Sequence, residues 1–212
     1  YSNIRKFIRY LLGCNIGEIL TMFLAILGKI PLPLLPIQIL WINLVTDGLP
    51  AVALCVEPGE PELMQEKPRP PQEGIFSRGL GYRILIQGLT IGAITIGVFI
   101  LTLRMGNGLV TARTMAFCTL VFSQLSYVFA CRSETLPLFK MKPWHNPYLL
   151  GAVALSSLMQ YLVVSHPVGM RLFHTARLTP QAWGIVLLGA FCSVLVAETV
   201  SLTGRLVKRR LS

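Results

Sequence analysis

The chain has 212 residues, of which 53% are hydrophobic and only 13% are charged. A mean hydropathy of +0.64 is too apolar for a soluble domain of this length and indicates a membrane protein with several spans. The formal net charge of +10 could indicate nucleic-acid binding, but the basic residues fall between apolar runs. We therefore expect a lipid bilayer and no nucleic acid as partner, with the charge setting orientation in the membrane.

Six apolar segments are long enough to cross a bilayer, so the chain is predicted to be an all-α, multi-pass integral membrane protein. They cover residues 10–27, 34–54, 83–103, 114–131, 147–164 and 181–203. An even number of spans places both termini on one side, together with fourteen of the nineteen Lys and Arg residues. This asymmetry predicts that both termini are cytoplasmic.

Polar residues interrupt the first two spans. Asn15 and Glu18 are three residues apart, and Asn43, Thr46 and Asp47 have spacings of three and one, so each group lies on one side of its helix. A charge at the centre of a bilayer costs about 3 kcal/mol or more and needs a partner or a function.

Two helix breakers, Gly48 and Pro50, follow Asp47 directly. Pro50 has no N–H to donate to the carbonyl of Thr46, so the second helix is predicted to be partly unwound around Gly48 and Pro50. Discontinuous helices at membrane depth are tolerated where they line a cavity or an ion site.

A very short loop, "GKIPLP", joins the first two spans and predicts a tight hairpin in which their polar faces meet. The hairpin then offers two carboxylates, two amide oxygens, one hydroxyl and some backbone carbonyls. Ca²⁺ takes about 6–8 such oxygen ligands, and the lack of Cys and His argues against Cu⁺ or Zn²⁺. The alternative is that these groups only hydrogen-bond helix to helix. For Gln124 in the fourth span, a ligand role and simple interhelical bonding stay open.

The loop over residues 55–82 is the longest on the side of the termini. It mixes acidic residues such as Glu57 with Lys67 and Arg69, and its prolines limit regular helix. It is either a solvated connector or a docking surface for a cytoplasmic domain.

Three stretches, "FIRYLLGCNIGE", "PIQILWINLVTDGLPAVAL" and "KPRPPQEGIFSRG", resemble the last six membrane helices of the P-type ATPases. The resemblance is to the type II calcium pumps of the sarco/endoplasmic reticulum kind and their bacterial relatives, and it covers residues 1 to about 203. It implies helices five to ten of the transport domain. The implied parts are the end of a cytoplasmic stalk helix (1–9), an ion-binding hairpin (10–54), a cytoplasmic loop (55–82), four supporting helices (83–203) and a basic tail (204–212).

The resemblance also implies roles for single residues. Asn15, Glu18 and Thr46 would serve one calcium site, Asn43 a second, and Asp47 would bridge both. Gln124 stands where the two-site reticulum pump has Glu. The resemblance therefore leaves open whether the chain has one calcium site or two.

In the long loop, the resemblance implies that Glu60, Glu62 and Arg69 couple to the phosphorylation domain. Sodium/potassium and proton/potassium pumps usually have Asp in place of Asn43 and Pro in place of Gly17, which favours calcium.

The motifs DKTG, TGES and GDGxND do not occur in the chain, so alone it is not expected to hydrolyse ATP. The sequence opens as a mid-domain segment would, and we expect a piece of a longer pump in a plasma membrane. Its partners would be the phosphorylation domain, through which ATP and Mg²⁺ act, and the first four membrane helices. The alternatives are the same fold moving Mn²⁺, Na⁺ or K⁺, or a stand-alone carrier or channel, which often shows internal repeats not visible here.

Overall fold

The computed structural model describes residues 1–59, 74, 76–77, 79–133, 141 and 143–211, with backbone only from residue 201 onwards. Every regular element in this part is helical. The elements are α1 (Ser2–Leu27), α2 (Pro36–Trp41), the π-helical η1 (Ile42–Thr46), α3 (Gly48–Cys55), α4 (Leu80–Arg104), α5 (Leu109–Cys131), the 3-10 turn η4 (Pro143–His145), α6 (Pro147–Ser165), α7 (Pro167–Phe173) and α8 (Pro180–Leu211).

Six segments of the described chain are long and apolar enough to cross a membrane, as predicted. The second of them, Pro36–Cys55, comprises α2, η1 and α3. The first is longer than expected, because α1 runs without a break from Ser2 through the predicted boundary between residues 9 and 10.

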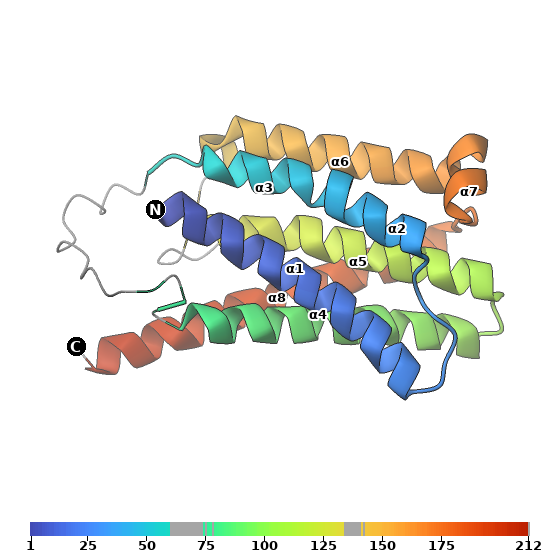
Figure 1. Ribbon diagram of the computed structural model, residues 1–212, viewed down its shortest axis with the longest axis horizontal. Helices are drawn as coiled ribbons and strands as arrows, with labels where there is room; N and C mark the ends of the chain where they lie inside the picture. Colours follow the sequence, from blue (N-terminus) through green and yellow to red (C-terminus); the bar gives the residue numbers. More distant parts are fainter. Residues whose placement is uncertain (60–73, 75, 78, 134–140, 142, 212) are drawn as a thin grey trace.

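The segment α2–η1–α3 lies alongside α6, α4 lies alongside α8, α5 runs between these two pairs, and α1 crosses α4 (Figure 1). The N-terminus and the end of α8 lie at the same end of the bundle, which we call the terminal end (Figure 1). The loops that join α1 to α2 and α4 to α5 lie at the opposite, hairpin end. The two ends of the chain therefore lie at one end of the bundle, whereas their placement in the cytoplasm stays a prediction.

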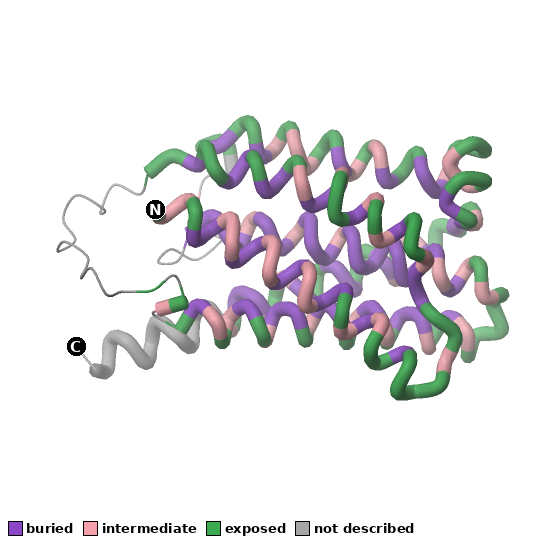
Figure 2. The backbone as a smooth tube through the Cα atoms, in the orientation of Figure 1, coloured by how far each residue is buried: buried purple, intermediate pink, exposed green. Residues whose placement is uncertain are grey.

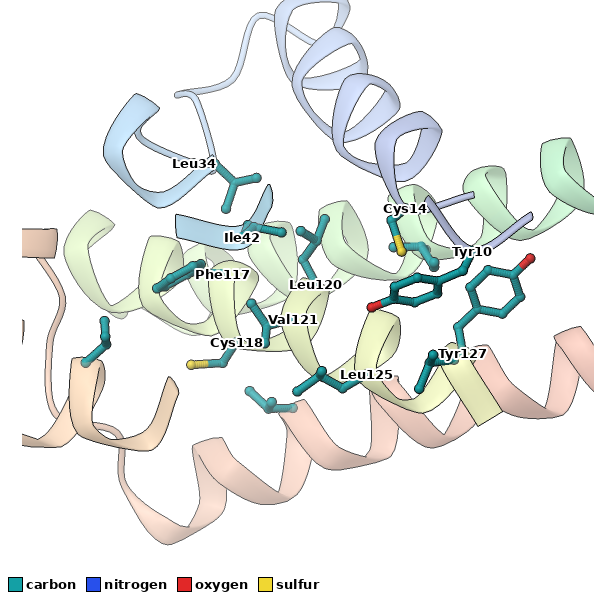
Figure 3. Close-up of a cluster of buried hydrophobic side chains, with 14 of the residues drawn as sticks. Tyr10, Cys14, Leu34, Ile42, Phe117, Cys118, Leu120, Val121, Leu125 and Tyr127 are labelled. Carbon is teal, nitrogen blue, oxygen red and sulfur yellow. The ribbon is translucent and has the colours of Figure 1, made fainter. Parts of the chain in front are cut away.

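Helix α5 forms the centre of the bundle. It is buried on nearly every side, whereas the other long helices alternate buried and exposed positions (Figure 2). Its apolar side chains, among them Phe117, Leu120 and Leu125, pack into the main core together with Tyr10 and Cys14 of α1 (Figure 3). A helix that is buried all round in this way needs few charged residues, and α5 has only Arg113.

Helices α1 and α4 cross at glycines. A methyl group at Gly17 would lie 2.9 Å from Cγ2 of Ile91, and one at Gly88 would overlap the side chain of Ile16. Gly92 of α4 also faces α1, four residues after Gly88. Small residues with this spacing let two membrane helices approach closely. At Gly17 the missing side chain makes room for α4.

The second span is irregular, as predicted, but the irregular turn precedes the two helix breakers. The N–H of Asp47 donates to the carbonyl of Ile42, five residues back, at 2.9 Å. Gly48 and Pro50 instead form the first turn of α3. Proline is tolerated in a first turn, and its missing N–H affects the carbonyl of Thr46 in the preceding turn. The widened π turn therefore lies before Gly48.

Candidate cation site

Glu18 links three helices near the middle of the bundle. Its side chain is buried on α1, and each carboxylate oxygen accepts one hydrogen bond from an amide. Asn43 Nδ2 of η1 donates to Oε2 at 2.8 Å, and Gln124 Nε2 of α5 donates to Oε1 at 2.9 Å. The predicted meeting of the two polar faces is thus present, and Gln124 joins them.

Asp47 lies at the joint between η1 and α3 and is 1% exposed. Its Oδ1 accepts a hydrogen bond from the hydroxyl of Tyr10 at 3.1 Å. Within the described part of the chain, Asp47 Oδ2 and Gln124 Oε1 are buried without a hydrogen-bond partner. An unsatisfied buried acceptor costs about 1–3 kcal/mol, and more when it is charged. Both atoms are therefore candidates to contact a cation.

Thr46 and Asn15 use their hydrogen-bond donors within their own helices. The hydroxyl of Thr46 donates to Ile42 O at 3.0 Å, and Asn15 Nδ2 donates to Leu11 O at 2.9 Å. These bonds orient both side chains while their oxygens keep lone pairs for another partner. The described contacts do not connect Asn15 to Glu18, although the two lie on one helix face.

Tyr10 is a site residue that the sequence analysis did not single out. It is completely buried, and its ring centroid lies 6.2 Å from that of Tyr127 on α5. Figure 3 shows Tyr10 and Cys14 side by side on α1, facing α5. The signal was available, because Tyr10, Cys14 and Glu18 follow one another at intervals of four and so lie on one helix face.

The chemistry of the site is that of oxygen ligands. No group of three His, Cys, Asp or Glu residues that could hold a metal ion occurs among the described residues. Two carboxylates, amide and hydroxyl oxygens and backbone carbonyls remain. Pro50 also has no N–H for the carbonyl of Thr46, which adds one more acceptor. Such a set suits hard cations.

The family model described as "Cation transporting ATPase, C-terminus" matches residues 31–203. The chain is 48% identical over 211 residues to the "Calcium-transporting ATPase" of Bacillus subtilis (strain 168), covering 99% of this chain and 23% of that relative. It is 39% identical over 218 residues to "Calcium-transporting ATPase 1" of Bacillus cereus (strain ATCC 10987 / NRS 248), covering 95% of this chain and 24% of the relative. The chain thus spans about a quarter of the length of these relatives.

Proposed function

Because the chain belongs to the cation-transporting ATPase family and matches its C-terminal membrane region, we propose that it forms part of an ATP-driven calcium pump. In this pump Glu18 and Asp47 ligate the transported Ca²⁺ within the membrane. The pump lies in a plasma membrane, and the terminal end of the bundle faces the cytoplasm. The phosphorylation domain and the first four membrane helices complete the pump, and ATP and Mg²⁺ act through the former.

One observation carries the proposal: the hydrogen bonds to the carboxylates of Glu18 and Asp47 come from neutral groups. The donors among the described residues are two amides, a phenol and the thiol of Cys14, and Asp47 Oδ2 is buried without a hydrogen-bond partner among these residues. Two acidic groups held without a basic partner in an apolar interior are costly unless a cation joins them. A transported cation supplies this missing charge.

The further ligands we propose are Asn15, Asn43 and Thr46, with Gln124 as a weaker one. Ca²⁺ accepts about 6–8 oxygens in irregular geometry, which a π turn beside a proline can supply. The names of the two bacterial relatives favour calcium. Mn²⁺ uses the same oxygen ligands and is the alternative cargo.

Gln124 has two roles in the proposed site. Its NH₂ group orients Glu18, and its Oε1 is left to face the ion. Because this side chain is neutral, the site carries two negative charges, which one divalent ion balances. A Glu at this position would add a third charge and favour a second ion or a proton.

Residues Glu60, Glu62 and Arg69 lie outside the described residues. We propose that they contact the phosphorylation domain in the complete pump.

The test is ATP-driven uptake of ⁴⁵Ca²⁺ into vesicles that contain the full-length protein. Asp47→Asn and Glu18→Gln are expected to abolish uptake and calcium-dependent phosphorylation, and Gln124→Glu to change the number of ions bound. The matched control is Glu198→Gln, since Glu198 is a buried carboxylate on α8 outside the site.

Normal uptake by Asp47→Asn would refute the ligand assignment. ⁵⁴Mn²⁺ uptake that exceeds ⁴⁵Ca²⁺ uptake at equal concentration would replace calcium by manganese as the cargo.

A further inference from the structure

Another buried carboxylate, Glu57, lies at the terminal end of the bundle just after α3. Both of its oxygens are occupied: Arg132 Nε donates to Oε1 at 2.9 Å, and Asn146 Nδ2 donates to Oε2 at 2.6 Å. Glu57 is 8% exposed and Arg132 is 4% exposed. Arg132 caps the C-terminus of α5, and Asn146 caps the N-terminus of α6. Glu57 therefore ties the end of α3 to two helices of the central bundle.

The backbone at the end of α3 is held in the same way. The last carbonyls of a helix have no partner within the helix and need one from elsewhere. Asn146 Nδ2 donates to Ala53 O at 3.1 Å, and Asn3 Nδ2 of α1 donates to Cys55 O at 3.0 Å and to Glu57 O at 2.8 Å. The end of α3 is thus hydrogen-bonded both to α1 and to the α5–α6 pair.

These four residues, Asn3, Glu57, Arg132 and Asn146, form what we call the α3 clamp. A buried ion pair is weak evidence for stability, because desolvation offsets much of the attraction between the charges. Its geometry, however, is strict, and the pair fixes one arrangement of the elements it joins. This suggests that the clamp acts on the position of α3.

Helix α3 connects the clamp directly to the candidate cation site. Asp47 precedes its first residue, and Glu57 lies ten positions later, about 15 Å along a helix axis. The π turn η1 on the other side of Asp47 lacks regular α-helical bonding, so it is the segment that can absorb a shift of α3. Helix α1 contacts the second span at both levels, through Asn3 at the clamp and through Tyr10 and Glu18 at the site.

We propose that Glu57 is a positioning residue that holds α3 between α1 and the α5–α6 pair and thereby sets the place of Asp47 relative to Glu18. The proposal rests on the proposed function, since it concerns the calcium affinity of the same site. Movement of α1 at Asn3 would shift α3 through the clamp and change the distance between the two carboxylates.

The experiment measures the Ca²⁺ concentration that gives half-maximal phosphorylation by ATP, in the full-length protein. Glu57→Gln is expected to raise it by about two- to thirty-fold, the range of measured coupling effects. Phosphorylation at saturating Ca²⁺ should remain, because no proposed ligand is changed. Glu57→Asp, which keeps the charge, should recover part of the affinity.

The matched control is Gln87→Leu. Gln87 also makes a buried interhelical bond, with its Nε2 donating to Ser193 Oγ at 3.0 Å, but it joins α4 to α8 and does not touch α3. A shift for Glu57→Gln no larger than that for Gln87→Leu, at equal amounts of folded protein, would overturn the proposal.

If Glu57→Gln does not fold, Asn3→Ala provides the test. It removes the hydrogen bonds between α1 and the end of α3 and leaves the ion pair between Glu57 and Arg132 intact. An unchanged calcium dependence in Asn3→Ala would then overturn the proposal. The proposed function fails separately, when Asp47→Asn retains calcium-dependent phosphorylation. If the clamp variants keep the calcium dependence of the wild type while Asp47→Asn loses calcium-dependent phosphorylation, only the positioning role of Glu57 is refuted.

Discussion

Asp47 and Glu57 lie at the two ends of α3, and both are buried carboxylates, yet their surroundings differ. Glu57 has a hydrogen bond on each oxygen, and one donor is the charged guanidinium of Arg132. Asp47 has only neutral neighbours, the phenol of Tyr10 and the thiol of Cys14, and its Oδ2 is buried without a hydrogen-bond partner among the described residues. The protein thus satisfies one carboxylate completely with its own groups and leaves the other incomplete.

This difference separates structural charges from functional ones. A carboxylate that the fold neutralises by itself contributes to the position of the helices it joins. One that the fold leaves without a basic partner is stable only when another charge arrives, and at membrane depth this is a strong indication of function. Glu18 belongs with Asp47 in this respect, because both of its partners are amides.

The largest expected effect is on ion binding by Asp47→Asn. Loss of one buried charged partner costs about 2–5 kcal/mol, or roughly 30- to 4000-fold in affinity. Equilibrium ⁴⁵Ca²⁺ binding to the full-length protein in detergent measures it, with Glu198→Gln as the control. Equal affinities for Asp47→Asn and the control would remove the distinction between the two ends of α3.

The second prediction concerns stability without calcium. Glu57→Gln removes a carboxylate that is bonded to the buried Arg132 and is expected to lower the free energy of unfolding by about 3–5 kcal/mol. Asp47→Asn removes a charge that has no basic partner and is expected to be neutral or stabilising. Thermal unfolding of both variants in a calcium chelator makes the comparison. Similar losses in both would mean that Asp47 is as fully satisfied as Glu57.

A smaller effect is expected for Tyr10→Phe, which removes the hydrogen bond to Asp47 Oδ1. A bond to a charged group contributes about 1.5–3 kcal/mol. Bound Ca²⁺ should restore part of this loss, so calcium should raise the unfolding temperature more in the variant than in the wild type. Tyr127→Phe is the control, since the hydroxyl of Tyr127 is also buried but bonds to Arg9 O, at 3.5 Å, and not to Asp47. A calcium effect equal in both variants would contradict the expectation.

The smallest effect is expected for Asn43→Ala. Asn43 is largely exposed, and Glu18 keeps its bond from Gln124 when the Asn43 amide is removed. We expect a loss of about 0.5–1.5 kcal/mol, or roughly 2- to 12-fold in calcium affinity. Asn107→Ala at the hairpin end provides the control. A loss as large as that of Glu18→Gln would make Asn43 a principal ligand and not an orienting one.

The sequence was sufficient to predict the six spans, the pairing of the termini on one side and the irregular second helix. These features follow from local properties, namely the length of apolar runs, the parity of the spans and the missing N–H of Pro50. The sequence also predicted that the polar faces of the first two spans meet, since a short loop leaves few arrangements for two adjacent spans, and the bond from Asn43 to Glu18 is such a contact. Asn15 remains a proposed ligand on the strength of its position next to Glu18.

Only the tertiary structure revealed the partners that come from distant parts of the chain. The bond from Tyr10 to Asp47 depends on the rotation of α1 against the π turn, which is decided by how α1 packs against the neighbouring helices. The α3 clamp joins Asn3, Glu57, Arg132 and Asn146, residues up to 143 positions apart in the sequence. Composition and periodicity place each of them near a helix end, but side-chain pairing between helices is decided by packing, which local sequence patterns do not encode.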